Sequence, residues 1–218
     1  MLRTNVYIDG FNLYYAIRKT PFKWLNLSAL CSRLLPTYNI QKIEYFTAIV
    51  IALPHDLNVT LRQATYLHAL RTLPDLEIHD EGHFVQWPRL LPQYPLAYIG
   101  TNNPARPPQT VQVLKAEEKG SDVNLASLLL RDCFKNDFDE AAVISNDSDL
   151  TTPIEIVVKD FGKPVTIINP HKKAFLSHQL ISVASDYRQT INMSAYRDSQ
   201  FPPTMTDSNG TFSKPTTW

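Results

Sequence analysis

Four aspartates and one asparagine lie at comparable places in the predicted secondary structure: each comes at the end of a strand or in the first turn of a helix. They are Asp9, Asn12, Asp122, Asp147 and Asp149. Because the carboxyl ends of parallel strands meet at one edge of a sheet, where α/β proteins bind ligands, we expect these side chains to converge. Carboxylates within a few ångström of one another repel strongly unless cations lie between them. The positions of these residues therefore predict a cation site.

Asp122 gives the strongest single argument for a bound cation. It begins an apolar stripe at helical spacing, so it projects from the helix face that packs on the sheet. The stripe consists of Leu125, Ala126, Leu129, Leu130 and Cys133. Gly120 and Ser121 before it are expected to form a turn and an N-cap. A carboxylate on this face has to be paired, neutralised or bound to a cation, because an unpaired buried charge is very costly.

The predicted ligands are all oxygen atoms, without cysteine or histidine, and this donor set suits Mg²⁺ or Mn²⁺. The chemistry that such a site favours is phosphodiester hydrolysis. One ion lowers the pKa of a bound water, and the same ion or a second one about 4 Å away stabilises the pentacoordinate phosphorane and the leaving oxygen.

Each residue also has a structural interpretation. An Asp-Gly pair such as Asp9-Gly10 is often only a turn, and Asp122 and Asp149 could merely complement helix dipoles. The segment 147–151 also matches the DxDxT signature of haloacid-dehalogenase-type phosphatases, but that family carries it on its first strand. His79 and His83 are four residues apart, but the β pattern around Gly82 argues against a zinc-binding helix, so we expect both to face solvent.

The chain alternates between strand and helix patterns, which predicts crossover units, a mainly parallel sheet and a three-layer α/β/α fold. We expect strands at 5–8, 42–53, 76–87, 110–114, 141–145 and 164–168, and helices at 11–19, 27–35, 56–73, 121–134, 153–161 and 180–191. The six prolines within 88–108 predict a long surface loop.

The composition predicts one ordinary globular domain at 1–195, followed by a flexible tail at 196–218 that is rich in Pro, Thr, Ser, Asn and Gly. Lys plus Arg equals Asp plus Glu at 21 each, so bulk charge does not indicate a nucleic-acid partner. Cys31 and Cys133 are isolated and are expected to be buried thiols. We find neither a signal-like apolar region nor a membrane span in the sequence, and expect a cytoplasmic protein.

Three segments resemble the NYN domain of the LabA-like group, within the PIN-like nuclease superfamily. They are YIDGFNLYY, EKGSDVNLA and AAVISNDSDLTTPIEIV with the following GKPVTIINP, and they run in order from residue 6 to residue 168. The resemblance implies a PIN-like fold and a metal-dependent ribonuclease, a hydrolase. By motif, it implies that Asp9, Asp122, Asp147 and Asp149 bind metal, that Asn12 orients a ligand or water, and that Ser145 shapes the strand end.

One position departs from the family pattern. Members commonly have glycine where this chain has Asn146, a residue that tolerates the left-handed conformation better than most. The candidate substrate-binding residues are Lys119, Ser145 and Asn146. Lys119, beside the acidic residues, could contact backbone phosphate, and a solvated lysine is the alternative.

The expected partner is RNA, with single strands favoured, and a homodimer or a regulatory protein partner fits the same resemblance. The main alternative is a non-catalytic PIN-like module that binds RNA or protein, which the neutral charge and Asn146 favour and the four aspartates oppose. A toxin-like nuclease restrained by a partner is a third possibility.

Overall fold

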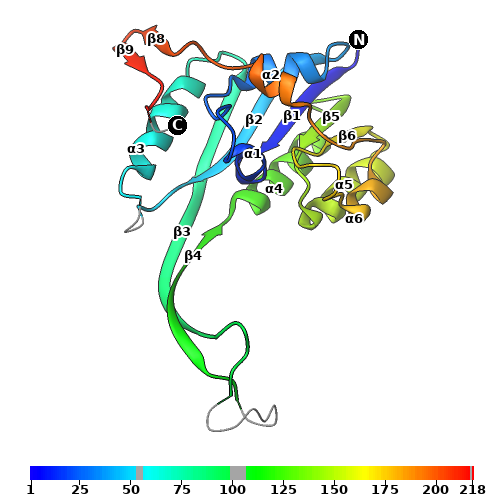
Figure 1. The fold of residues 1–218 in the computed structure, drawn as a ribbon. Helices are drawn as coiled ribbons and strands as arrows, with labels where there is room; N and C mark the ends of the chain where they lie inside the picture. Colours follow the sequence, from blue (N-terminus) through cyan, green and yellow to red (C-terminus); the bar gives the residue numbers. More distant parts are fainter. Residues whose placement is uncertain (53–55, 99–106, 217) are drawn as a thin grey trace.

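In the computed structural model, which describes residues 1–52, 56–98, 107–216 and 218, a seven-stranded sheet organises the chain in the order β4-β3-β2-β1-β5-β6-β7 (Figure 1). The strands are β1 (Arg3–Asp9), β2 (Asn39–Ile49), β3 (Leu76–Pro92), β4 (Thr110–Lys119), β5 (Glu140–Ile144), β6 (Val165–Ile168) and β7 (Asp186–Arg188). Every neighbouring pair in this sheet is parallel except β3 with β4.

Helices cover both faces of the sheet, which confirms the predicted three-layer α/β/α fold. They are α1 (Gly10–Ile17), α2 (Leu27–Leu34), α3 (Val59–Leu70), α4 (Ser121–Phe134), α5 (Thr151–Lys159), α6 (His178–Val183) and α7 (Met193–Arg197), with a 3₁₀ turn η1 (Ser148–Leu150) before α5. Successive β1 residues enter opposite layers, as a strand requires. Val6 and Ile8 join the core under α1, α2 and α3, whereas Tyr7 joins the core under α4, α5 and α6.

The proline-rich segment differs from the expected loop in its first part. β3 continues through Pro88 to Pro92 and pairs with β4, from Pro88 opposite Leu114 to Pro92 opposite Thr110. The pairing of β3 with β2 ends at His83, and beyond that residue no strand of the described part of the chain pairs with this edge of β3. A proline at such an edge lacks only an outward N–H, and Figure 1 shows the β3–β4 ribbon extending away from the body. Residues 99–106 of the predicted loop lie outside the described residues.

The predicted helix at 180–191 is also wrong in its second half. α6 ends at Val183, and β7 follows as an edge strand paired with β6. The β-branched and aromatic residues that precede position 192 belong to this strand or to the segment after it.

The described residues within 196–218, a segment expected as a flexible tail, include a helix end and a β-hairpin. After α7 they form a hairpin of β8 (Thr204–Asp207) and β9 (Gly210–Ser213), which Figure 1 shows beside α3. Phe201 is buried, and its ring lies 5.8 Å from that of Trp24. Aromatic contacts of this kind fix a segment that composition alone marks as loosely ordered.

Candidate metal centre

Three of the singled-out aspartates meet where the central strands end. Asp9 is the last residue of β1, Asp147 follows the neighbouring strand β5, and Asp122 lies in the first turn of α4. One carboxylate oxygen from each lies within 4.8 Å of the others. The geometry thus brings together carboxylates from three distant segments. Asp9 and Asp147 meet because β1 and β5 are parallel neighbours. Asp122 joins them from the end of the antiparallel strand β4, where Lys119 pairs with His83 of β3.

A short chain of hydrogen bonds fixes the carboxylates of Asp9 and Asp147. Asp9 is the N-cap of α1 and accepts the backbone N–H of Asn12 at 2.9 Å. Its other oxygen accepts the Ser145 hydroxyl at 2.9 Å, and the same hydroxyl accepts the Asp147 N–H at 3.0 Å. Asp147 in turn accepts the N–H of Asp149 at 2.9 Å. Ser145 therefore connects the turn after β5 to the end of β1.

The electrostatics of the cluster favour a bound cation. Burial raises the pKa of Asp9 to about 6, helped by the charges of Asp147 and Glu118, although the hydrogen bonds from Asn12 and Ser145 oppose it. Burial and then the charge of Asp9 raise the pKa of Asp122 to about 7, with further repulsion from Asp147, Glu118 and Asp149. The pKa values of Asp9 and Asp122 are thus raised by burial and by neighbouring negative charges, and none of these causes is a positive side chain of the described residues. A divalent cation would compensate these charges.

Asp149 lies apart from the three. It is exposed, in η1, and the group of mutually close oxygens does not include it. Its charge still contributes to the raised pKa of Asp122, so it belongs to the rim of the same negative field.

Glu118 is a neighbour of the site that the sequence did not single out. It lies in β4, contributes to the raised pKa values of both Asp9 and Asp122, and accepts the N–H of Ser121 at 3.0 Å. This bond satisfies a free N–H at the start of α4. Of the pair expected to form the turn and N-cap, Gly120 is the N-cap residue, with a φ of 103°, and Ser121 is the first residue of the helix. The predicted strand ended at residue 114, whereas β4 continues to Lys119. Continuing the strand beyond residue 114 would have placed Glu118 at the end of β4, next to Asp122.

Asn146 has a structural connection that its turn position did not reveal. Its N–H donates to Asn12 Oδ1 at 3.1 Å, and its own side-chain oxygen accepts the Tyr187 hydroxyl at 2.7 Å and the Ser177 N–H at 3.0 Å. Among the described non-glycine residues only Asn136 has a positive φ, so Asn146 does not adopt the left-handed conformation. Asn146 instead ties the turn after β5 to Ser177 at the start of α6 and to Tyr187 in β7.

Lys119 is half exposed and forms an ion pair with Glu117, its Nζ lying 3.3 Å from Glu117 Oε2. Lys115 pairs with the same carboxylate from the other side. The structure therefore places the lysine beside the acidic cluster without directing it into the cluster.

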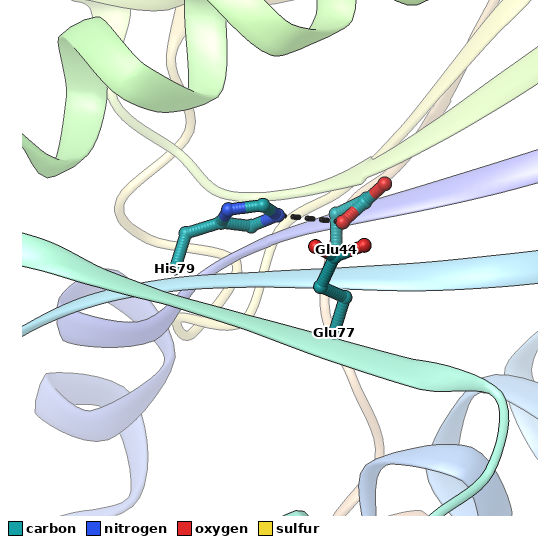
Figure 2. Close-up of side chains that lie close together, drawn as sticks. All are labelled: Glu44, Glu77 and His79. Atoms are coloured by element: carbon teal, nitrogen blue, oxygen red, sulfur yellow. Dashed lines mark hydrogen bonds and ion pairs between the residues drawn. The ribbon is translucent and has the colours of Figure 1, made fainter.

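A second group of possible ligands lies on β2 and β3: Glu44, Glu77 and His79 (Figure 2). Figure 2 shows the imidazole of His79 turned toward Glu44, and His79 Nε2 lies 2.6 Å from Glu44 Oε2. The His79 side chain is only 12% exposed and stacks on Phe46, so the expectation that it faces solvent is wrong.

Positive groups already compensate this second group. Lys42 Nζ lies 2.7 Å from Glu44 Oε1 and 2.9 Å from Asp132 Oδ2. Burial alone would raise the pKa of Glu44, but the hydrogen bonds from His79 and Lys42 outweigh it and lower that pKa. Burial likewise opposes protonation of His79, and Glu44 outweighs it, so the pKa of His79 is raised.

The fold and the acidic strand ends define a PIN-like α/β domain, and comparison with known proteins agrees. The NYN domain profile matches residues 3–192, and the chain therefore belongs to the NYN domain family, which is generally nuclease-like.

The individual proteins that resemble the chain include a curated enzyme and a solved structure. The 6-hydroxy-3-succinoylpyridine 3-monooxygenase HspA of Pseudomonas putida is 29% identical over 241 residues, covering 100% of this chain and 75% of that protein. The crystal structure of a protein of unknown function, VPA0982 from Vibrio parahaemolyticus, superposes with a TM-score of 0.56 at 16% identity, over 88% of this chain and 94% of that one. This second likeness supports the fold alone. Within the described residues, no helix combines the length and apolarity needed to cross a membrane.

Proposed function

We propose that this protein is a metal-dependent ribonuclease that hydrolyses phosphodiester bonds in single-stranded RNA. The observation that carries the proposal is the group of Asp9, Asp122 and Asp147, whose oxygens lie within 4.8 Å of one another and lack a compensating positive group among the described residues. The membership of the NYN family supports the same chemistry.

The residues fit a divalent ion such as Mg²⁺ or Mn²⁺. The donors are carboxylate oxygens, which these ions prefer, and the raised pKa values of Asp9 and Asp122 reflect a negative charge that a cation would relieve. Once bound, such an ion would lower the pKa of a water and screen the phosphate charge. Asp9, Asp122 and Asp147 would hold the ion, and Asp149 at the exposed rim is our candidate for orienting the attacking water.

Two of the substrate-binding candidates are better assigned to positioning. The Ser145 hydroxyl is engaged with Asp9 and Asp147, and the Asn146 side chain is engaged with Ser177 and Tyr187. Asn12 supports the turn at Asn146 through its side-chain oxygen. Lys119 remains our candidate for phosphate contact, since its pairing with Glu117 is exposed and therefore weak.

The finer assignments form part of this proposal: the LabA-like group, a cytoplasmic location, and a homodimer or a regulatory protein partner. They rest on the sequence motifs and on the family, and each needs its own measurement.

The test is cleavage of a labelled mixed-sequence single-stranded RNA with Mn²⁺, with Mg²⁺ and with EDTA. The Asp147→Asn variant removes one central carboxylate, and Asp160→Asn, at an exposed residue after α5, is the matched control. Metal-dependent cleavage by the parent and the control, lost in Asp147→Asn, supports the proposal. A folded parent that cleaves under no condition, and binds RNA equally with EDTA, selects the non-catalytic module instead.

A second candidate function is oxygenation of an aromatic ring, favoured by a specific observation: the match to the HspA monooxygenase covers this whole chain. A monooxygenase inserts one atom of O₂ into its substrate and reduces the other to water, which takes two electrons from a reductant. Consumption of O₂ with a hydroxypyridine and a two-electron reductant present, yielding a hydroxylated product, would establish it. An absence of such turnover, with cleavage of RNA intact, would exclude it.

A further inference from the structure

An apolar cavity of about 90 Å³ lies between α1, β2 and α3. Its lining includes the core residues Leu13, Ile17 and Tyr45, which pack on the sheet face opposite α4. Asp9 pairs in register with Phe46 of β2, and Phe46 belongs to the core on the α4 side. The cavity and the acidic cluster thus lie near the same strand ends but on opposite faces of the sheet.

Aromatic rings form much of the cavity wall. They are Phe11, Tyr14, Tyr45, Tyr66 and Trp218. The Tyr66 and Trp218 rings meet edge to face at 5.0 Å, and Trp24 supports Trp218 from behind at 6.0 Å. The Tyr66 hydroxyl donates to the Leu25 carbonyl at 2.8 Å, so Tyr66 offers its ring to the cavity and uses its polar end elsewhere. Walls of this kind favour a planar aromatic ring, which gains from offset or edge-to-face contacts.

Gly10 lines the cavity at a point where α1 lies close to β2. A Cβ built there would lie 2.8 Å from the Tyr45 hydroxyl and 2.5 Å from the Phe46 carbonyl oxygen. The close approach of α1 to β2 therefore leaves no room for a side chain at this part of the wall. With about 90 Å³ available, less than the about 150 Å³ of an apolar cavity known to bind benzene, a single ring with its substituent directed outward is the largest suitable ligand.

Lys23 adds a positive charge to this apolar wall. It is half-buried, and burial lowers its pKa, with further lowering from the charges of Arg62 and Lys214. Arg62 pairs with Asp56, and Lys214 donates to the Pro21 carbonyl at 3.2 Å. Among the described residues, which include every Asp and Glu of the chain, none forms an ion pair with Lys23.

We propose that this cavity binds a single-ring aromatic carboxylate, with the ring between Tyr66, Trp218 and α1 and the carboxylate on the Lys23 ammonium. An anion is favoured because it would neutralise a lysine crowded by two other cations, in a place where water is partly excluded. An aromatic ring is favoured over an aliphatic one by the geometry of the walls. The inference stands apart from the proposed nuclease, because its ligand and its residues are different.

The test titrates the full chain with benzoate and follows tryptophan fluorescence, since Trp218 lines the cavity, together with the melting temperature. Benzyl alcohol keeps the ring without the charge, and cyclohexanecarboxylate keeps the charge without the aromatic ring. We expect saturable binding of benzoate, with both analogues at least about tenfold weaker, corresponding to the loss of a charge-assisted hydrogen bond or of aromatic contacts.

Two variants locate the site. Lys23→Gln should weaken benzoate at least about tenfold while leaving benzyl alcohol unchanged. Val59→Trp, at the α3 wall, should fill the cavity and abolish binding, and its melting curve shows whether it folds. An absence of saturable benzoate binding, or equal binding by the parent and Lys23→Gln, would overturn the proposal. RNA cleavage is not a readout here, so failure of the nuclease proposal would leave this result interpretable.

Discussion

Two clusters of potential metal ligands lie on the same sheet, and their charges are balanced in opposite ways. In the acidic cluster of Asp9, Asp122 and Asp147, carboxylates face carboxylates, and the pKa values of Asp9 and Asp122 are raised. In the cluster of Glu44, Glu77 and His79, Lys42 and His79 lie against Glu44 and lower its pKa. Proximity of ligand atoms is therefore a poor criterion for a metal site. An uncompensated charge is the better one, because only that charge gains from a cation.

The largest expected effect separates the two clusters by activity. Asp147→Asn or Asp122→Asn should reduce metal-dependent RNA cleavage by a factor on the order of 10²–10³ or more, because each removes a ligand and a negative charge from the site. Glu77→Gln, in the other cluster, is exposed and should leave cleavage unchanged. Initial rates at saturating Mn²⁺ measure the difference. Equal losses in both clusters would refute the distinction drawn between them.

The two clusters should also differ in their effect on stability: a substitution in the compensated cluster should destabilise the protein, and one in the acidic cluster should stabilise it. Lys42→Met leaves the fully buried Asp132 and the buried Glu44 without their shared ammonium, and should lower the free energy of unfolding by about 2–3 kcal/mol. Asp122→Asn removes repulsion and should stabilise the metal-free protein at pH 8 by about 1 kcal/mol. Urea denaturation in EDTA measures both.

Lys119→Met is the matched control for the lysine change. Its partner Glu117 is well solvated, so the unfolding curve should barely move. A Lys42→Met protein as stable as this control would show that the Glu44 cluster needs no compensation.

The pH dependence of stability should reveal the acidic cluster directly. The folded pKa values of Asp9, about 6, and Asp122, about 7, lie above the value of about 3.9 expected in the unfolded chain. Between these pH values the folded state binds protons that the unfolded state has released. Protonation of Asp9 and Asp122 therefore stabilises the folded state fully below about pH 4, and this stabilisation is lost as pH rises through about 6 and 7.

Melting temperatures in EDTA should accordingly fall between pH 5 and pH 8, and added Mn²⁺ should reverse the fall at pH 8. Asp122→Asn should show a smaller fall than the parent. A parent whose melting temperature rises over this range in EDTA, beyond the change seen in Asp122→Asn, would contradict the repulsion described here.

The smallest effect is expected at Asn12. Asn12→Ala removes the acceptor for the Asn146 N–H but keeps the backbone bond to Asp9, so the carboxylates stay in place. Cleavage should fall by about tenfold or less, with Mn²⁺ affinity unchanged, since one neutral hydrogen bond contributes about 1 kcal/mol. Rates measured over a range of Mn²⁺ concentrations separate a change in maximal cleavage rate from a change in Mn²⁺ affinity. A loss as large as that of Asp147→Asn would make Asn12 a ligand-like residue.

The elements that follow from local pattern were accessible from the sequence. The helix expected at 121–134 coincides with α4, because its apolar stripe and its preceding glycine are local signals. The meeting of Asp9 and Asp147 followed from parallel topology, in which strand ends share an edge. Asp122 reaches the same place from the antiparallel strand β4, which the expected parallel pattern did not include.

Features that depend on tertiary contacts were not accessible. Glu118 escaped notice because β4 runs five residues beyond the predicted strand end, to Lys119. The Lys42–Asp132 pair joins residues 90 apart in the chain, and no local pattern announces it. The order of the C-terminal segment comes from Phe201 and Trp218 packing near Trp24, which polar composition conceals.

Direct measurement of Mn²⁺ binding tests the central claim, that the uncompensated cluster is the metal site. Free Mn²⁺ can be followed by electron paramagnetic resonance for the parent, Asp122→Asn and Glu77→Gln. The account predicts a saturable site in the parent and in Glu77→Gln, and an affinity at least about 100-fold lower in Asp122→Asn. Binding that survives Asp122→Asn but disappears in Glu77→Gln would place the metal at the other cluster and contradict the account.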